Sequence, residues 1–211
     1  MKIYFAACLF TCISACAQTT DATTKKERKV GGGCECCEAI FEQAPDLKTL
    51  NATDTLPDFS EAGPKMLVYG TIYKKDGTTP AAGVVRYIYH TDQTGLYTAT
   101  KDQTGCAKRN GRLRGWIKTN NKGEYWFYTL KPAAYPNAKI PAHIHPIIKE
   151  PGLSEYYIDE YRFEGDPLLT AEEISHDENR GGNGIIKLSP DANGMLLCKR
   201  DIILGKNIPG Y

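Results

Sequence analysis

The sequence has no excess of charge of either sign. Its 211 residues include 26 Lys and Arg against 25 Asp and Glu, which gives a formal net charge of +1. A protein that binds nucleic acid usually concentrates basic residues to meet the phosphates, and this balance gives no reason to expect such a partner. The composition therefore argues against a nucleic-acid-binding protein, and it leaves the oligomeric state open.

Long hydrophobic runs are also missing after the first residues. Lys2 is followed by an apolar run over residues 3–13, which is too short to span a bilayer and is typical of a signal peptide. The run leads into Ile13-Ser-Ala-Cys16, which resembles a bacterial lipobox. We therefore expect residues 1–15 to be a lipoprotein signal peptide and Cys16 to carry lipid.

Lipid on Cys16 would hold the protein on a membrane of the bacterial cell envelope. A multiply acylated cysteine anchors a protein stably, whereas a single acyl chain does not. The next residues, Ala17-Gln18, lack the Asp that commonly marks inner-membrane retention, so by analogy we expect the outer membrane of a Gram-negative cell. Ordinary cleavage after Ala15 or Ala17 is the alternative and would give a soluble exported protein.

The cysteines that follow Cys16 do not have the spacing of a zinc site. They are Cys34, Cys36, Cys37, Cys106 and Cys198. The group at 34–37 is crowded for tetrahedral zinc, and no second Cys or His pair lies at zinc-finger spacing. Because an exported protein meets an oxidising compartment, we expect disulfides, although the sequence leaves their pairing open. Five is an odd number, so at least one thiol stays free or pairs elsewhere.

No segment shows a long helical period, and short strand patterns take its place. Residues 16–33 are polar and glycine-rich and predict a flexible tether, and residues 34–64 are irregular and punctuated by proline. From 65 to 211 the strand patterns are 66–73, 84–90, 115–119, 124–130, 142–149, 156–163, 184–188 and 195–204, with one helical turn at 170–173. Short strands separated by Gly, Asn and Asp turns predict a single all-β domain, either a sandwich or a barrel.

Histidine is rare, and two of the four histidines stand in Pro141-Ala-His143-Ile-His145. Alternate side chains of a strand share a face, so His143 and His145 point the same way, about 6 to 7 Å apart along the backbone. Two imidazoles at that separation can share one metal ion, but the pair alone is also compatible with ordinary surface or core histidines. We expect the other two, His90 and His176, to lie on the surface, and Asp166 to belong to a turn.

Further motifs in fixed order resemble a known family. They are Gly70-Thr-Ile-Tyr-Lys-Lys-Asp-Gly, Gly95-Leu-Tyr97, Arg114-Gly-Trp-Ile-Lys-Thr, Gly123-Glu-Tyr-Trp-Phe-Tyr, Pro132-Ala-Ala-Tyr135-Pro, Pro141-Ala-His143-Ile-His145 and Tyr161-Arg-Phe-Glu-Gly-Asp166. Across residues 65–168 this run is similar to the catalytic domain of the intradiol ring-cleavage dioxygenases, which act on catechol and protocatechuate.

The resemblance implies a β-sandwich with a mononuclear Fe(III) site. It assigns four iron ligands, namely Tyr97, Tyr135, His143 and His145. Two phenolates and two imidazoles form a donor set that favours Fe(III) over Fe(II). By the same resemblance, a catechol-type ring and O2 are the substrates, and the ring opens between its two hydroxyl-bearing carbons. Tyr135 would be the catalytic tyrosine, which leaves the iron and takes up a substrate proton.

Four positions around the ligands depart from the family pattern. Ile140 stands where the family has an Arg that stabilises the reacting ring, and Glu160 where it has a Gln. Tyr89 and Asn137 replace two Trp residues. Changes in residues that support metal ligands can cost about 10- to 100-fold in affinity or activity. The resemblance therefore implies iron binding more directly than it implies fast ring cleavage.

Other functions are compatible with parts of the sequence. The start of the domain, from Gly70 to Val84, also resembles transthyretin-like domains, which would make the protein a non-catalytic surface module. An iron site without turnover would make it a catecholate or siderophore binder. Zinc or copper at His143 and His145 is a further alternative.

Overall fold

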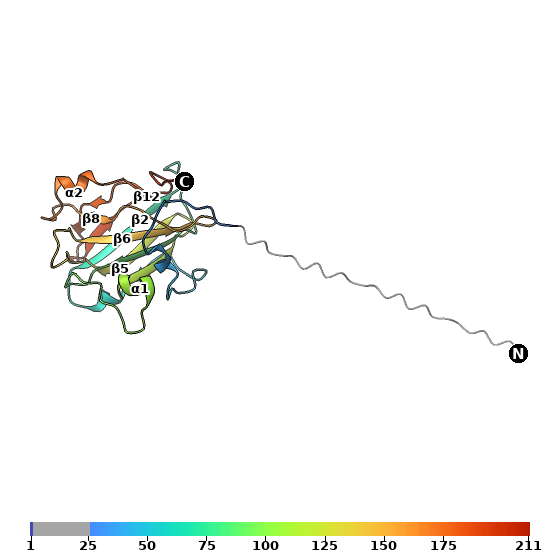
Figure 1. Cartoon of the computed structure of the whole chain (residues 1–211), viewed down its shortest axis with the longest axis horizontal. Helices are drawn as coiled ribbons and strands as arrows, with labels where there is room; N and C mark the ends of the chain where they lie inside the picture. Colours follow the sequence, from blue (N-terminus) through green and yellow to red (C-terminus); the bar gives the residue numbers. More distant parts are fainter. Residues whose placement is uncertain (2–25) are drawn as a thin grey trace.

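The computed structural model describes Met1 and residues 26–211 (Figure 1). The predictions of a signal peptide over 1–15, of lipid on Cys16 and of the first part of the tether concern residues 2–25, which lie outside the described residues. Within the described part of the chain, no helix has the length and apolar character needed to cross a membrane.

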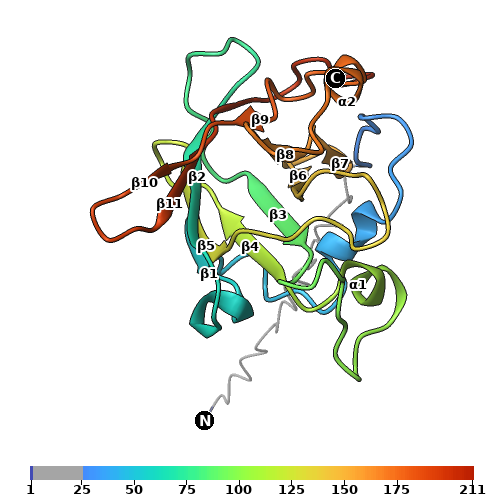
Figure 2. The same cartoon turned by 90° about the vertical axis from the view of Figure 1, so that its left-hand side faces the viewer.

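Two sheets of six strands form the domain (Figure 2). In the first sheet the strand order is β1-β5-β2-β11-β10, and β12 pairs with β2. Its strands are β1 (Thr53–Thr55), β2 (Lys65–Tyr73), β5 (Glu124–Leu130), β10 (Ser189–Pro190), β11 (Leu196–Lys199) and β12 (Ile202–Ile203). In Figure 2, β2, β5 and β11 lie to the left of β3, β6 and β8, which belong to the second sheet.

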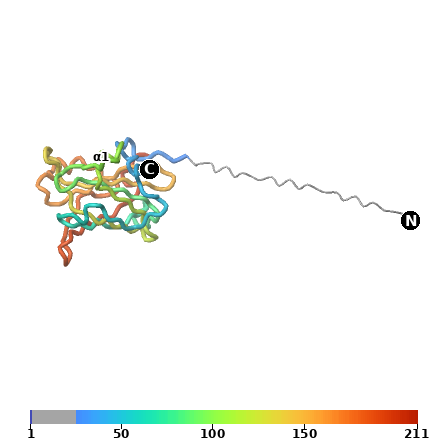
Figure 3. Tube along the Cα trace, turned by 90° about the horizontal axis from the view of Figure 1, so that it is seen from below, coloured from blue at the N-terminus to red at the C-terminus, as the bar shows by residue number. Residues whose placement is uncertain are grey.

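The second sheet has the order β4-β3-β6-β8-β9, and β7 pairs with β6. Its strands are β3 (Val85–His90), β4 (Arg114–Lys118), β6 (His143–Lys149), β7 (Tyr156–Tyr157), β8 (Tyr161–Phe163) and β9 (Ile185–Ile186). The helical elements are short; they are η1 (Cys37–Ile40), η2 (Pro57–Ser60), α1 (Gly105–Asn110) and α2 (Ala171–Ser175). Figure 3 shows α1 at the edge of the domain.

The main core lies between the sheets, where every second residue of a strand points inward. Along β2, buried and half-buried residues alternate, so Met66, Val68 and Ile72 face the core while their neighbours face outward. A smaller core covers the outer face of the second sheet, where Ile40 and Ala39 of η1 pack with Tyr87. The second sheet is therefore covered on both faces, and its outer face is enclosed by the N-terminal segment.

The all-β sandwich predicted from the sequence is confirmed, and the five strand patterns from 66 to 149 correspond to β2 to β6 within one residue at each end. The predicted helical turn at 170–173 falls at the start of α2, where the Thr170 side chain accepts a hydrogen bond from the Glu173 N–H. Asp166 lies in a turn, as expected, where its carboxylate accepts the Ala142 N–H at 3.1 Å.

The single strand predicted over 156–163 is two strands, β7 and β8. Ile147 pairs with Tyr157 and Ile144 pairs with Tyr161. The distance from 157 to 161 is four residues, whereas the matching distance along β6 is three residues. One extra residue is thus accommodated as a bulge opposite Pro146. The interruption has a physical cause at the same place, because Pro146 has no N–H to offer to a continuous ladder.

The flexible tether predicted over 16–33 is wrong for its last part. Arg28 forms a bridge with Leu153, and Val30 is buried in the main core. The carbonyl of Gly31 accepts a hydrogen bond from the buried Arg180 at 2.9 Å. The segment 34–64 is likewise packed on the sandwich, since Leu56 is 2% exposed and β1 pairs with β5. The folded unit therefore begins well before residue 65, because these segments cover apolar surface that the strands alone would leave in water.

The prediction of disulfides over metal in the Cys34 to Cys37 group is confirmed. Cys34 pairs with Cys37, and Cys36 pairs with Cys106. The second bridge joins the N-terminal segment to α1 across 70 residues of sequence. Cys198 is the free cysteine among the described residues, and it is buried.

The Cys36–Cys106 bridge should stabilise the fold more than Cys34–Cys37 does. A cross-link restricts the unfolded chain more when it closes a longer loop, so Cys36→Ala with Cys106→Ala should lower the free energy of unfolding by about 2–4 kcal/mol. Urea unfolding without reductant measures this loss. The matched control is Cys34→Ala with Cys37→Ala, whose bridge spans 3 residues of sequence and whose loss should be smaller. Equal losses for the two pairs would contradict the loop-closure account.

Candidate metal centre

The four predicted ligands converge on the outer face of the second sheet. His143 and His145 lie on β6, Tyr97 lies in the loop between β3 and α1, and Tyr135 lies in the loop between β5 and β6. The Tyr97 Oη lies 2.8 Å from the Tyr135 Oη and 2.8 Å from the His145 Nε2. The His143 Nε2 lies 3.0 Å from the His145 Nε2, 3.2 Å from the Tyr135 Oη and 3.5 Å from the Tyr97 Oη. Four potential donor atoms thus surround one point.

These separations fit coordination of a single metal ion. Bonds of about 2.1 Å place neighbouring ligand atoms about 3.0 to 3.4 Å apart for angles between 90° and tetrahedral. The observed distances run from 2.8 to 3.5 Å, close to this interval. Both imidazoles direct Nε2 toward the common point, since their Nδ1 atoms have other partners: the Pro141 carbonyl for His143 and the Glu160 carboxylate for His145. Two phenols and two imidazoles form a donor set suited to ferric iron.

The protonation of the metal-free site follows from its burial. Burial raises the pKa of the Tyr97 and Tyr135 phenols above the usual value of 10. Burial, and then the neighbouring His145, lower the pKa of His143. At neutral pH the phenols therefore hold their protons and His143 is neutral. Coordination by both tyrosinates would release two protons, so binding of a metal ion here becomes tighter as pH rises.

Two of the positions that depart from the family pattern contact His145. Tyr89 stacks on the imidazole, with ring centroids 4.4 Å apart and an interplanar angle of 14°. The Glu160 carboxylate lies 2.9 Å from the His145 Nδ1. Burial alone would raise the pKa of Glu160, but the hydrogen bond that its carboxylate accepts from His145 opposes burial, and the pKa is lowered to about 2. Glu160 is thus an anion at neutral pH.

Ile140 and Asn137, the other two positions that depart from the family pattern, do not contact His145 as Tyr89 and Glu160 do. Ile140 is 39% exposed, and Asn137 is also exposed, both in the loop before β6. A different cation lies near the site, since Arg109 of α1 lines a cavity of about 250 Å³ together with Tyr97, Tyr135 and His145. The Arg109 guanidinium pairs with Glu35 at 2.6 Å. No sequence motif indicates Arg109, because only the packing of α1 beside the site brings it there.

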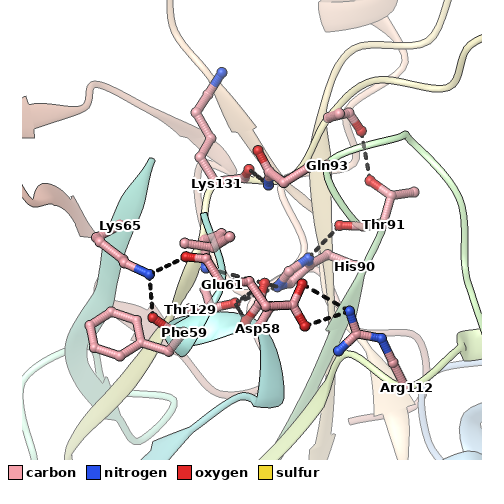
Figure 4. Close-up of polar contacts among 12 residues, drawn as sticks. Asp58, Phe59, Glu61, Lys65, His90, Thr91, Gln93, Arg112, Thr129 and Lys131 are labelled. Atoms are coloured by element: carbon pink, nitrogen blue, oxygen red, sulfur yellow. Dashed lines mark hydrogen bonds and ion pairs between the residues drawn. The ribbon is translucent and has the colours of Figure 1, made fainter. Parts of the chain in front are cut away.

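The expectation that His90 lies on the surface is wrong, because its side chain is fully buried between β3, β5 and η2 (Figure 4). Its Nδ1 lies 2.8 Å from the Thr91 carbonyl oxygen, and its Nε2 lies 2.7 Å from the Thr129 Oγ1. Thr129 in turn donates to the buried Asp58 carboxylate at 2.9 Å. Each nitrogen of the buried imidazole thus has an oxygen within hydrogen-bond distance.

This buried network supports the loops that carry the two tyrosines. Thr91, directly after His90, donates from Oγ1 to the Ala133 carbonyl at 2.6 Å, and this contact joins the Tyr97 loop to the Tyr135 loop. Gly95 lies against the same loop, with φ +78°, where a Cβ would collide with the Ala134 carbonyl. This hydrogen bond and the close approach of Gly95 therefore hold the two loops together beside the candidate metal centre.

Removal of the Thr129 hydroxyl should destabilise the protein. In Thr129→Val, two buried polar groups, Asp58 and His90, lose their shared partner, which should lower the free energy of unfolding by about 1–3 kcal/mol. Urea denaturation followed by tyrosine and tryptophan fluorescence measures the change. Thr71→Val is the matched control, because it makes the same substitution at a half-buried position of β2. A loss no larger than that of the control would show that the network contributes little.

Comparisons with known proteins are consistent with this geometry. The model of the family described as Dioxygenase matches residues 40–188. Catechol 1,2-dioxygenase 1 of Acinetobacter lwoffii is 32% identical over 132 residues, which cover 55% of this chain and 40% of the relative. The protocatechuate 3,4-dioxygenase beta chain of Burkholderia cepacia is 29% identical over 118 residues, which cover 53% of this chain and 50% of the relative. The matches thus span half or less of these relatives' lengths.

Solved structures with the same fold agree. The 3-chlorocatechol 1,2-dioxygenase of Rhodococcus opacus 1CP matches with a TM-score of 0.55 and 22% identity, over 72% of this chain and 64% of that one. The dioxygenase domain of a dioxygenase carbohydrate-binding protein fusion from Streptomyces sp. SirexAA-E matches with a TM-score of 0.52 and 21% identity, over 69% of this chain and 82% of that one. At these identities the structural likeness establishes the fold.

Proposed function

The chain belongs to the intradiol ring-cleavage dioxygenase family, and on this premise we propose that it is an oxidoreductase that opens a catechol-type ring with O2. The observation that carries the proposal is the convergence of Tyr97, Tyr135, His143 and His145 through their Oη and Nε2 atoms. In this proposal the four atoms hold one ferric ion.

The reaction needs a group that binds the catechol oxygens and makes the ring reactive toward O2. Bound at this site, Fe(III) would supply a Lewis acid and a template for the substrate. The bond between the two hydroxyl-bearing carbons breaks, both atoms of O2 enter the product, and a muconate-type diacid results. Tyr135 is half-buried and lines the cavity, so its Oη is placed to take a proton from a catechol hydroxyl.

The cavity beside the donor atoms suits a small aromatic ring. Its volume is about 250 Å³, and Tyr89 and Tyr97 supply aromatic walls. Arg109 is the cationic side chain on its lining, so it would face the negative charge of a bound catecholate. This cation would stand in place of the arginine that the family pattern has at Ile140.

A second candidate function keeps the iron but not the turnover. Ile140 brings no charge, and Glu160 places an anion beside His145, so two polar features around the reacting ring differ from the family pattern. These observations favour an iron-dependent catecholate binder as the alternative. Consumption of O2 separates the two functions, since a binder would retain the catechol unchanged.

Loading the purified full chain with Fe(III) tests the site. We expect one iron per chain and a visible absorption band from tyrosinate to Fe(III). Loss of a residue that supports a metal ligand costs about 10- to 100-fold in affinity. His143→Ala removes a ligand itself, so the affinity for iron should fall by more than this. His176→Ala is the control, because His176 is exposed at the end of α2 and should leave the band unchanged.

The same preparation tests the activity with an oxygen electrode on catechol, protocatechuate and hydroxyquinol. The proposal expects one O2 consumed per ring for at least one of the three. A colourless protein after loading would refute the iron site. A coloured protein that consumes no O2 with any of them would refute the enzyme and support the binder.

We also infer that the protein is exported and lipid-anchored at Cys16 in the bacterial cell envelope, at the outer membrane. The lipobox-like residues 13–16 support this, and the two disulfides suit an oxidising compartment. Cys16→Ser should move the protein from the membrane to the soluble fraction, as measured by immunoblotting of fractionated cells. Cys198→Ser is the control, and a Cys16 variant that stays in the membrane would contradict the anchor.

A further inference from the structure

The two imidazoles of the candidate metal centre differ in what their Nδ1 atoms contact. The His143 Nδ1 lies 2.7 Å from the Pro141 carbonyl oxygen, a neutral acceptor. The His145 Nδ1 lies 2.9 Å from the Oε1 of Glu160, a carboxylate. A hydrogen bond to an ionised acceptor is about twice as strong as one to a neutral acceptor. The two histidines are therefore not equivalent as ligands.

The bulge between β7 and β8 directs Glu160 toward His145. Ile158 and Tyr161 on either side of it are both buried in the main core, and the extra residue lies between them. Bulges beside active sites commonly redirect a side chain in this way. Here the outcome is a half-exposed carboxylate, 39% accessible, on the same outer face of the sheet as His145.

Tyr89 packs against the flat face of the His145 imidazole. Tyr89 of β3 is the register partner of His145 on β6, which places the two rings side by side. The stacked ring fixes the plane of the imidazole, and Glu160 fixes its rotation by holding the Nδ1 edge. The Nε2 atom is then left to face Tyr97 and His143. Tyr89 and Glu160 are both departures from the family pattern, and they act on one ligand.

We propose that Glu160 is a positioning residue that holds His145 in the Nδ1–H tautomer and makes its Nε2 a stronger donor to iron than that of His143. This inference rests on the proposed iron site and deepens it. A carboxylate that accepts the outer N–H of a histidine ligand increases the basicity of that ligand. Two tyrosinates and Glu160 together balance the three positive charges of Fe(III), so the ferric state is favoured over the ferrous state.

Glu160→Gln separates charge from shape, since glutamine keeps an acceptor oxygen and loses the negative charge. In the iron-loaded full chain, we expect affinity for iron to fall about 10- to 100-fold. The tyrosinate-to-iron band should move to longer wavelength, and the Fe(III)/Fe(II) potential should become more positive. Glu164→Gln is the matched control, because Glu164 is an exposed glutamate just after β8 with no side-chain partner among the described residues.

The metal-free protein gives an independent readout. Nitrogen-15 NMR at fixed neutral pH should find His145 in the Nδ1–H tautomer in the natural chain and in Glu160→Gln. Glu160→Ala, which removes the acceptor, should lose that preference. An unchanged tautomer in Glu160→Ala would overturn the positioning role, and a band and potential in Glu160→Gln equal to those of Glu164→Gln would overturn the charge effect. A natural chain that takes up no iron would refute the proposed function instead, and the tautomer would still decide the contact between Glu160 and His145.

Discussion

The pairing of β3 with β6 is the constraint on which the rest of the site depends. Tyr89 lies opposite His145, and His90 lies opposite Ile144. This register puts both histidines of the His-Ile-His motif on the outer face and buries Ile144 in the main core. A slip of one residue would exchange these faces, so the burial of Ile144 also fixes where the imidazoles point. The candidate metal centre thus takes its geometry from the packing of the sandwich.

The tyrosines reach the histidines from loops, which need other support. The His90, Thr129 and Asp58 network lies under these loops, and the contact between Thr91 and Ala133 joins them. The N-terminal segment closes the outer face through η1 and through the disulfide from Cys36 to Cys106. As a result, elements that are distant in the sequence support the four side chains of the candidate metal centre.

Patterns with a local cause could be predicted from the sequence. The strands from 66 to 149 follow from alternation and turn residues, and the four donor atoms follow from the family motifs. What could not be predicted depends on contacts between distant residues. Arg109 reaches the cavity because α1 packs there, and His90 is buried because Asp58 and Thr129 meet it from other elements. The partner of Glu160 depends on a one-residue bulge, which alternation over 156–163 does not reveal.

We propose that Tyr97, Tyr135, His143 and His145 bind one ferric ion. Anomalous X-ray diffraction at the iron absorption edge, on crystals of the iron-loaded chain, tests it most directly. We expect one strong peak within about 2.1 Å of the Oη atoms of both tyrosines and the Nε2 atoms of both histidines. A peak bound by the histidines alone, or one elsewhere in the molecule, would contradict it.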